Sequence, residues 1–143
     1  MRARAAVVAG GTEPAAATSE ALAQQPDVNA GIIEAHERGL TSMALETLTA
    51  RYGNTVRVIG PGTVINRGSV ISLDVENVHP HDLGQILDEF GVCVRPGHHC
   101  AKPLMRILGV PATSRASTYL YNDERDIDAL IEALGRAEAF FAL

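Results

Sequence analysis

The chain has 143 residues, of which 46% are hydrophobic and 20% are charged, and its formal net charge is −5. This length fits one domain that buries its own core, and the composition is typical of a globular protein. Because 12 basic residues face 17 acidic ones without a basic stripe, we expect no nucleic-acid binding. No apolar run approaches the ~20 residues that span a bilayer, and residues 5–9 are too short for a signal peptide. We therefore expect a cytoplasmic protein with no membrane contact.

Residues 1–30 form an alanine-rich lead segment, and we treat residues 31–143 as the domain proper. Within the lead segment, the run Gly-Gly-Thr-Glu-Pro at 10–14 predicts a turn. A helix would follow, starting at Thr12 or Glu13 and ending near Gln24, although alanine favours a helix without specifying its buried face.

The next segments predict a helix and a hairpin. Residues 30–51 carry apolar side chains near helical spacing and therefore predict one amphipathic helix. Residues 56–59 and 69–75 predict two strands, because both are rich in β-branched residues. The Asn-Arg-Gly turn at 66–68 favours pairing of these strands as a hairpin.

The second half of the chain predicts alternating helices and strands. The expected elements are a helix from His79 to Phe90, a strand at 92–94, a short helix at 103–108, a strand at 116–121 and a final helix, capped by Asn122, that ends near Phe140. This order predicts an α+β fold, with a mostly antiparallel sheet and helices packed on one face.

The loop Arg-Pro-Gly-His-His-Cys-Ala-Lys-Pro-Leu, residues 95–104, concentrates reactive groups in ten positions. Cys100 precedes the short helix, whose amide groups and dipole favour a thiolate. His98, His99 and Arg95 add positive potential, so we expect a nucleophile rather than a buried, inert cysteine. Cys93, by contrast, lies in an apolar run, and we expect it in the core.

Two other features of the residues bear on chemistry. A zinc site built from His98, His99 and Cys100, with His79 or His81, is an alternative, but neighbouring residues rarely converge on one metal and the spacing of known zinc motifs is absent. The chain also has only one lysine, Lys102, so any chemistry that needs a Schiff-base lysine must use Lys102 or another chain.

The loop resembles the active-site cysteine motif of group II (Suf-type) cysteine desulfurases, which belong to the class V aminotransferase superfamily. The resemblance covers about residues 31–134. Its further parts are Val78–Asp82, Met105, Leu108–Ala112, Arg115–Ser117 and Tyr121–Asn122. It implies the small C-terminal domain of a fold-type I enzyme that uses pyridoxal 5′-phosphate (PLP).

The resemblance also implies roles for single residues. Such enzymes convert L-cysteine to L-alanine and leave a persulfide that supplies sulfur for iron–sulfur clusters. Cys100 would be the nucleophile, and Arg115 would bind the substrate carboxylate through a bidentate fork. Arg95 would support the cysteine loop near the substrate, and His98 and His99 would play supporting roles. Gly11-Thr12 looks like the Gly-Thr pair that reaches the PLP phosphate of the neighbouring subunit.

The chain departs from the family because the family's PLP lysine lies in a large preceding domain. Lys102 falls at a variable motif position, so we expect no PLP bound covalently to this chain and no activity of the chain alone. The expected partners are L-cysteine, a sulfur-acceptor protein, and a PLP-binding domain or homodimer partner. A non-enzymatic sulfur-relay domain and a purely structural domain remain as alternatives, and the chain could be a fragment, a truncated gene product or a stand-alone domain.

Overall fold

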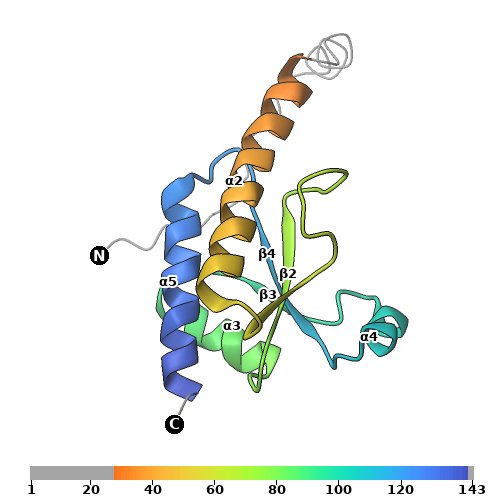
Figure 1. The fold of residues 1–143 in the computed structure, drawn as a ribbon, viewed down its shortest axis with the longest axis vertical. Coiled ribbons are helices and arrows are strands. Elements are labelled where there is room, and N and C mark those ends of the chain that lie inside the picture. The colour runs from red at the N-terminus through yellow and green to blue at the C-terminus, as the bar shows by residue number, and fades with distance from the viewer. Residues whose placement is uncertain (1–27, 142–143) are drawn as a thin grey trace, which may run out of the picture.

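The structure, a computed structural model, describes residues 28–141 as an α+β fold (Figure 1). Its elements in chain order are α2 (Val28–Tyr52), β1 (Val56–Ile59), β2 (Val70–Val75), α3 (Pro80–Glu89), β3 (Arg95–Gly97), α4 (Lys102–Leu108), β4 (Thr113–Ser117) and α5 (Glu124–Phe141). The strands form one sheet in the order β1-β2-β4-β3, and every neighbouring pair is antiparallel. The predicted fold class is confirmed. The helix predicted between Thr12 and Gln24 lies outside the described residues.

The alternation of side chains along β2 defines the two faces of the sheet. Ile71, Leu73 and Val75 are buried and belong to the core that the sheet shares with α2, α3 and α5. Since successive side chains of a strand point to opposite faces, Ser72 and Asp74 lie on the other face. In Figure 1, α2, α3 and α5 gather on one side of the strands, while α4 lies apart from them. The second face of the sheet is therefore not covered by these three helices.

The two strands predicted in the second half are shifted along the chain. The prediction of a strand at 92–94 is wrong, because this segment continues from the end of α3, where the amide of Val92 donates to the carbonyl of Leu87 (2.9 Å). Pairing with β4 starts only at Arg95.

The predicted strand 116–121 is also misplaced, because β4 covers Thr113–Ser117. Its buried positions are the polar residues Thr113 and Ser114, and the Ser114 hydroxyl donates to the carbonyl of Pro80 (3.1 Å). The apolar run after the strand is exposed instead and forms a turn, in which the amide of Asn122 donates to the carbonyl of Tyr119 (3.0 Å). A search for apolar residues therefore selects the wrong part of this segment.

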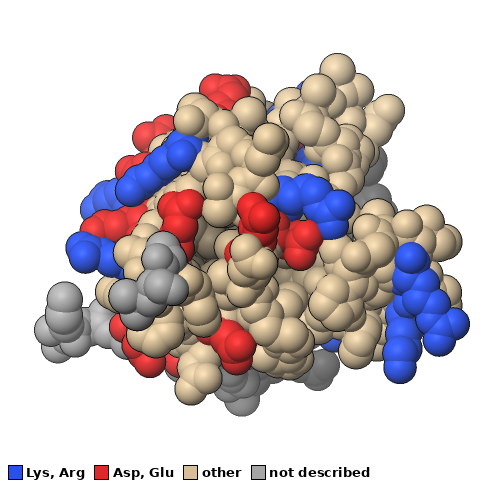
Figure 2. All heavy atoms as spheres, turned by 60° about the horizontal axis from the view of Figure 1, so that its bottom comes forward, with Lys and Arg blue, Asp and Glu red and all other residues tan. Residues whose placement is uncertain are grey.

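Acidic and basic side chains are distributed unevenly over the surface (Figure 2). Figure 2 shows Asp, Glu, Lys and Arg side chains interleaved over one side of the molecule. A separate group of Lys and Arg side chains stands at the right of the same view, the side on which Figure 1 places α4. Helix α4 contributes the exposed residues Lys102 and Arg106. The residues that follow Cys100 thus form a basic edge on a chain whose net charge is negative.

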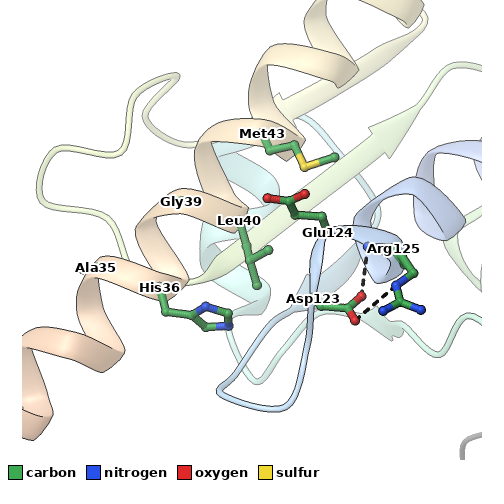
Figure 3. A pocket seen from close by; sticks show the side chains of 8 residues that line it. All are labelled: Ala35, His36, Gly39, Leu40, Met43, Asp123, Glu124 and Arg125. Atoms are coloured by element: carbon green, nitrogen blue, oxygen red, sulfur yellow. Dashed lines mark hydrogen bonds and ion pairs between the residues drawn. The ribbon is translucent and has the colours of Figure 1, made fainter.

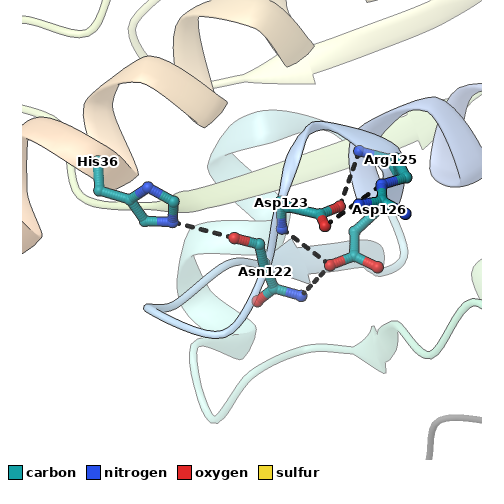
Figure 4. A network of polar contacts seen from close by, with 5 residues as sticks. All are labelled: His36, Asn122, Asp123, Arg125 and Asp126. Atoms are coloured by element: carbon teal, nitrogen blue, oxygen red, sulfur yellow. Dashed lines mark hydrogen bonds and ion pairs between the residues drawn. The ribbon is translucent and has the colours of Figure 1, made fainter.

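A hollow lies between α2 and the start of α5, lined by residues that include His36, Leu40, Met43 and Glu124 (Figure 3). On one wall, His36 Nε2 lies 3.0 Å from the carbonyl oxygen of Asn122, which ties the β4–α5 connection to α2 (Figure 4). None of the residues of the 95–104 loop lines this hollow. We therefore read it as the junction of two helices rather than as the centre of the chemistry.

The start of α5 corrects the predicted helix cap. The carboxylate of Asp123, not Asn122, accepts from a helix amide, that of Arg125 (2.9 Å). The carboxylate of Asp126 accepts in turn from the amide of Asp123 (3.0 Å), which completes a capping box. Asn122 lies one residue earlier and uses its side-chain oxygen to accept from the amide of Tyr119 (2.9 Å). Its side-chain amide donates to the carboxylate of Asp126 (Figure 4).

One buried side chain joins α2 to α5 and makes the fold testable. The hydroxyl of Tyr52 donates to the carbonyl oxygen of Ile131, and only 6% of the Tyr52 side chain is exposed. Changing Tyr52 to Phe removes this buried hydrogen bond, so we expect the free energy of unfolding to fall by about 1 kcal/mol. Tyr121→Phe is the matched control, because Tyr121 is 73% exposed, and it should leave the urea denaturation midpoint almost unchanged.

The same tyrosine predicts a loss of stability at high pH. Burial raises the pKa of Tyr52 above its usual value of 10.0, so the folded state holds the phenol proton more tightly than the unfolded state. The contribution of Tyr52 is therefore complete below pH 10 and is lost as the pH rises from there through the folded pKa. Urea denaturation at pH 9 and above pH 10 should show a steeper loss for the wild type than for Tyr52→Phe. Equal slopes would contradict the assignment.

Candidate functional site

The candidate site lies on the sheet face that α2, α3 and α5 leave open. Strand β3 pairs with β4 so that Arg95 is opposite Arg115, and Arg115 is opposite Ser72 on its other side. Since Ser72 lies on the open face, both arginines share that face. Two segments that are separated in sequence thus bring two guanidinium groups to neighbouring positions.

These two arginines lack acidic partners among residues 28–141. The ion pairs of the described residues join Arg38, Arg57, Arg125 and Arg136 to acidic side chains, and none involves Arg95 or Arg115. The Nε atom of Arg115 is buried and has no hydrogen-bond partner within the described part of the chain. Neighbouring like charges with an unsatisfied donor favour a bound anion, and a guanidinium group suits a carboxylate in particular.

The position of Arg95 depends on a close contact behind the strand. Helix α3 contacts β3, and a Cβ atom added at Gly84 would lie only 3.3 Å from Cγ of Pro96. Since Pro96 adjoins Arg95, this contact leaves little space between α3 and the strand. The absence of a side chain at Gly84 therefore allows α3 to pack closely against β3, the strand that carries Arg95.

The cysteine loop follows β3 directly. Cys100 is exposed and lies in a turn in which the amide of Ala101 donates to the carbonyl of His98 (2.8 Å). It comes immediately before Ala101, the residue at the N-terminal cap of α4. An exposed thiol on a turn is accessible to a reagent or a second protein, which a buried cysteine is not.

The two histidines of the loop differ in their surroundings. His98 is exposed, whereas His99 is partly buried and its Nε2 atom lies 3.0 Å from Thr113 Oγ1 and 3.2 Å from the Thr113 carbonyl oxygen. Burial lowers the pKa of His99, the hydrogen bond to the Thr113 carbonyl opposes this shift in part, and the charges of Arg115 and Arg95 lower the pKa further. His99 is therefore held in its neutral form close to both arginines.

The structure corrects the expectation for Cys93. Both cysteines are free, and Cys93 is exposed, with its thiol 3.8 Å from a carboxylate oxygen of Asp88. The flanking residues Val92 and Val94 are the ones that pack against the core. In an extended segment alternate side chains point in opposite directions, so the two valines turn Cys93 outward. The apolar run was correctly recognised, but its inward-facing positions were wrongly assigned.

The structure brings some of the other predicted site residues to one strand. Arg95 pairs with Arg115, and His99, the residue before Cys100, contacts Thr113 of the same strand. Thr12 is outside the described residues. Within residues 28–141, no three His, Cys, Asp or Glu side chains are grouped so that they could hold a metal ion. No helix in this part of the chain is both long and apolar enough to cross a membrane.

Sequence reasoning missed Thr113, which contacts the cysteine loop. Thr113 is 1% exposed and binds His99 although 14 positions separate them. A threonine at the start of a strand carries no chemical signal of its own. Only the pairing of Gly97 with Thr113 in the sheet shows that the loop returns to this position.

Comparison with known proteins identifies the family. A model of the aminotransferase class-V family matches residues 7–130. A probable cysteine desulfurase of Streptomyces coelicolor is 48% identical over 109 residues, which cover 76% of this chain and 26% of that protein. A probable cysteine desulfurase of Halobacterium salinarum is 44% identical over 126 residues, which cover 88% of this chain and 30% of that protein.

Solved structures agree with this assignment. The cysteine desulfurase CsdA of Escherichia coli matches with a TM-score of 0.71 and 34% identity, over 85% of this chain and 29% of that one. The cysteine desulfurase of Thermococcus onnurineus matches with a TM-score of 0.70 and 34% identity, over 75% of this chain and 26% of that one. The chain thus spans under a third of the length of these relatives, and none of them is named as a sulfur-relay domain. The chain belongs to the aminotransferase class-V family, and it matches a segment of the cysteine desulfurases within that family.

Proposed function

We propose that the chain is the cysteine-bearing segment of a group II (Suf-type) cysteine desulfurase and that Cys100 accepts sulfur from L-cysteine. The observation that carries the proposal is the exposed Cys100 turn beside two arginines that have no acidic partner among the described residues. The match to cysteine desulfurases supports the substrate, and the loop motif supports the subgroup.

In this reaction the C–S bond of L-cysteine breaks and an S–S bond forms on Cys100. The carbon that loses the sulfur takes up a proton, so that L-cysteine and the Cys100 thiol give L-alanine and a persulfide on Cys100. An exposed turn suits this role, because the persulfide must afterwards reach a sulfur-acceptor protein. The thiolate is the attacking form, as in other cysteine nucleophiles.

Arg115 and Arg95 give this segment a means of holding the substrate. We assign the carboxylate of L-cysteine to Arg115, whose Nε atom is buried without a partner among residues 28–141. Arg95, directly opposite on β3, adds a second positive charge and supports the loop. His98 and His99 then line the same loop, and His99, held neutral, adds no third fixed charge.

The described residues do not fit a covalent PLP site. Lys102 is exposed and begins α4, so its ammonium group lies at the surface rather than in an enclosed site. We therefore assign the PLP lysine to a part of the enzyme that this chain does not contain. The proposed partners are this PLP-binding part or a homodimer partner, together with a sulfur acceptor for iron–sulfur cluster assembly, in a cytoplasmic setting where thiols stay reduced.

Purified alone and mixed with PLP, the chain should not catalyse the release of L-alanine from L-cysteine. The physical reason is that Lys102, its only lysine, is solvent-exposed on α4. The measurement is L-alanine production, with the visible absorbance of bound PLP as a second readout. Turnover that requires PLP and persists in Lys102→Ala would show that another group of the chain supports the reaction.

The role of Cys100 is tested after the chain is joined to the PLP-binding part of a relative. Cys100→Ala should abolish persulfide formation, which mass spectrometry detects, because the acceptor sulfur is gone. Cys93→Ala is the matched control, since Cys93 is also a free, exposed cysteine but precedes β3 and is not part of the turn that follows it. The proposal fails if Cys100→Ala still forms protein persulfide at the wild-type rate, or if only Cys93→Ala prevents it.

The role of Arg115 is tested in the same joined enzyme. Removing one charge-assisted hydrogen-bonded pair costs roughly 1.5–3 kcal/mol. Arg115→Ala should therefore weaken L-cysteine binding by about one to two decades. Arg115→Lys should recover only part of this loss, because an ammonium group cannot form the bidentate fork. Arg57→Ala is the control, since Arg57 already pairs with Asp74 (2.8 Å). Unchanged affinity in Arg115→Ala would overturn the assignment.

A further inference from the structure

The turn that carries Cys100 has an unfavourable backbone conformation. His99 has φ +53° and Cys100 has φ +61°, so two consecutive residues with side chains occupy the left-handed region. Gly97, two residues before His99, has φ +132°, which glycine adopts without steric cost. Because L residues disfavour the left-handed region, such a pair persists only when surrounding contacts hold it. The conformation of the turn therefore requires a stabilising contact with the rest of the fold.

The side chain of His99 supplies a contact of this kind. Its Nε2 atom reaches both the carbonyl oxygen (3.2 Å) and Oγ1 (3.0 Å) of Thr113. Thr113 is almost completely buried at the start of β4, where it is paired with Gly97. The contact therefore joins the loop to a buried position of the sheet.

The chemistry of the contact fixes which nitrogen carries the proton. A carbonyl oxygen only accepts hydrogen bonds, so Nε2 must be the protonated nitrogen when it binds the Thr113 carbonyl. The Nδ1 atom is then the bare nitrogen, and it is buried with no hydrogen-bond partner within residues 28–141. Thr113 also lies two residues before Arg115 on the same strand, so both side chains point to the same face of the sheet.

We propose that His99 is a positioning residue that, through Thr113, fixes the turn of Cys100 relative to the strand of Arg115. The contact thereby sets the geometry between the sulfur acceptor and the group that binds the substrate carboxylate. This inference rests on the proposed roles of Cys100 and Arg115. It can be tested apart from them, because the order of the turn is measurable without any sulfur chemistry.

The test is amide hydrogen exchange by NMR on the whole chain. The reporter is the amide of Ala101, which donates across the turn to the His98 carbonyl (2.8 Å), and the reference is the amide of Leu73 in the sheet core. In His99→Ala, exchange at Ala101 should accelerate by roughly tenfold, the factor expected from losing one or two ordinary hydrogen bonds. Exchange at Leu73 should not change. His98→Ala is the matched control, because His98 is exposed, and it should leave both rates unchanged.

Two further variants separate positioning from general destabilisation. His99→Gln keeps a side-chain N–H donor and should restore much of the slow exchange at Ala101. Thr113→Val removes Oγ1 but keeps the carbonyl, and should accelerate exchange by a smaller factor than His99→Ala. The ring nitrogen shifts of His99 should show a neutral imidazole with its proton on Nε2.

Three results would overturn the inference. They are unchanged exchange at Ala101 in His99→Ala, equal acceleration at Ala101 and Leu73, and a His99 ring whose proton is on Nδ1. If His99→Ala does not fold, His99→Gln and Thr113→Val still decide the matter through the same reporter. The proposed function fails on a different readout, namely persulfide formation that does not need Cys100.

Discussion

The pairing of β3 with β4 is the constraint on which the candidate site depends. It places Arg95 opposite Arg115, although like charges at such positions repel each other and destabilise the sheet. Within residues 28–141, no acidic side chain forms an ion pair with either of them. Packing on the buried side of the same strands offsets this repulsion. There the hydroxyl of Ser114, the neighbour of Arg115, donates to the Pro80 carbonyl. The core thus holds together two charges that would otherwise separate.

The two faces of the sheet carry different kinds of side chain. On one face Ile71, Leu73 and Val75 meet α2, α3 and α5 and form the core. On the other face lie the polar and charged side chains, among them Ser72 and Arg115. Because strand register fixes which residue faces which side, a shift of β4 by one residue would bury Arg115. The register is therefore as important to the proposed activity as the identity of the arginine.

The sequence alone predicted most of the architecture, because long amphipathic helices and β-branched strands have clear patterns. It failed where polarity and burial diverge: β4 hides Thr113 and Ser114, while the apolar Tyr119 and Leu120 stay exposed. The inward and outward positions around Cys93 were also assigned wrongly, since alternation fixes a period but not which side faces the core. Arg95, Arg115 and Cys100 became candidates through a motif, and their roles stay predictions. Thr113 was not found, because its contact with His99 exists only after the sheet forms.

The close packing of α3 against β3 links a position behind the sheet to the arginine in front of it. The missing side chain at Gly84 leaves just enough space for Pro96, the neighbour of Arg95. A larger residue at position 84 would push on the strand from behind, without touching the thiol, the substrate or either guanidinium group. Pro96 would have to give way by a few tenths of an ångström, and Arg95 adjoins it. Position 84 is thus coupled through Pro96 to an arginine on the opposite face of the sheet, although the two residues do not touch.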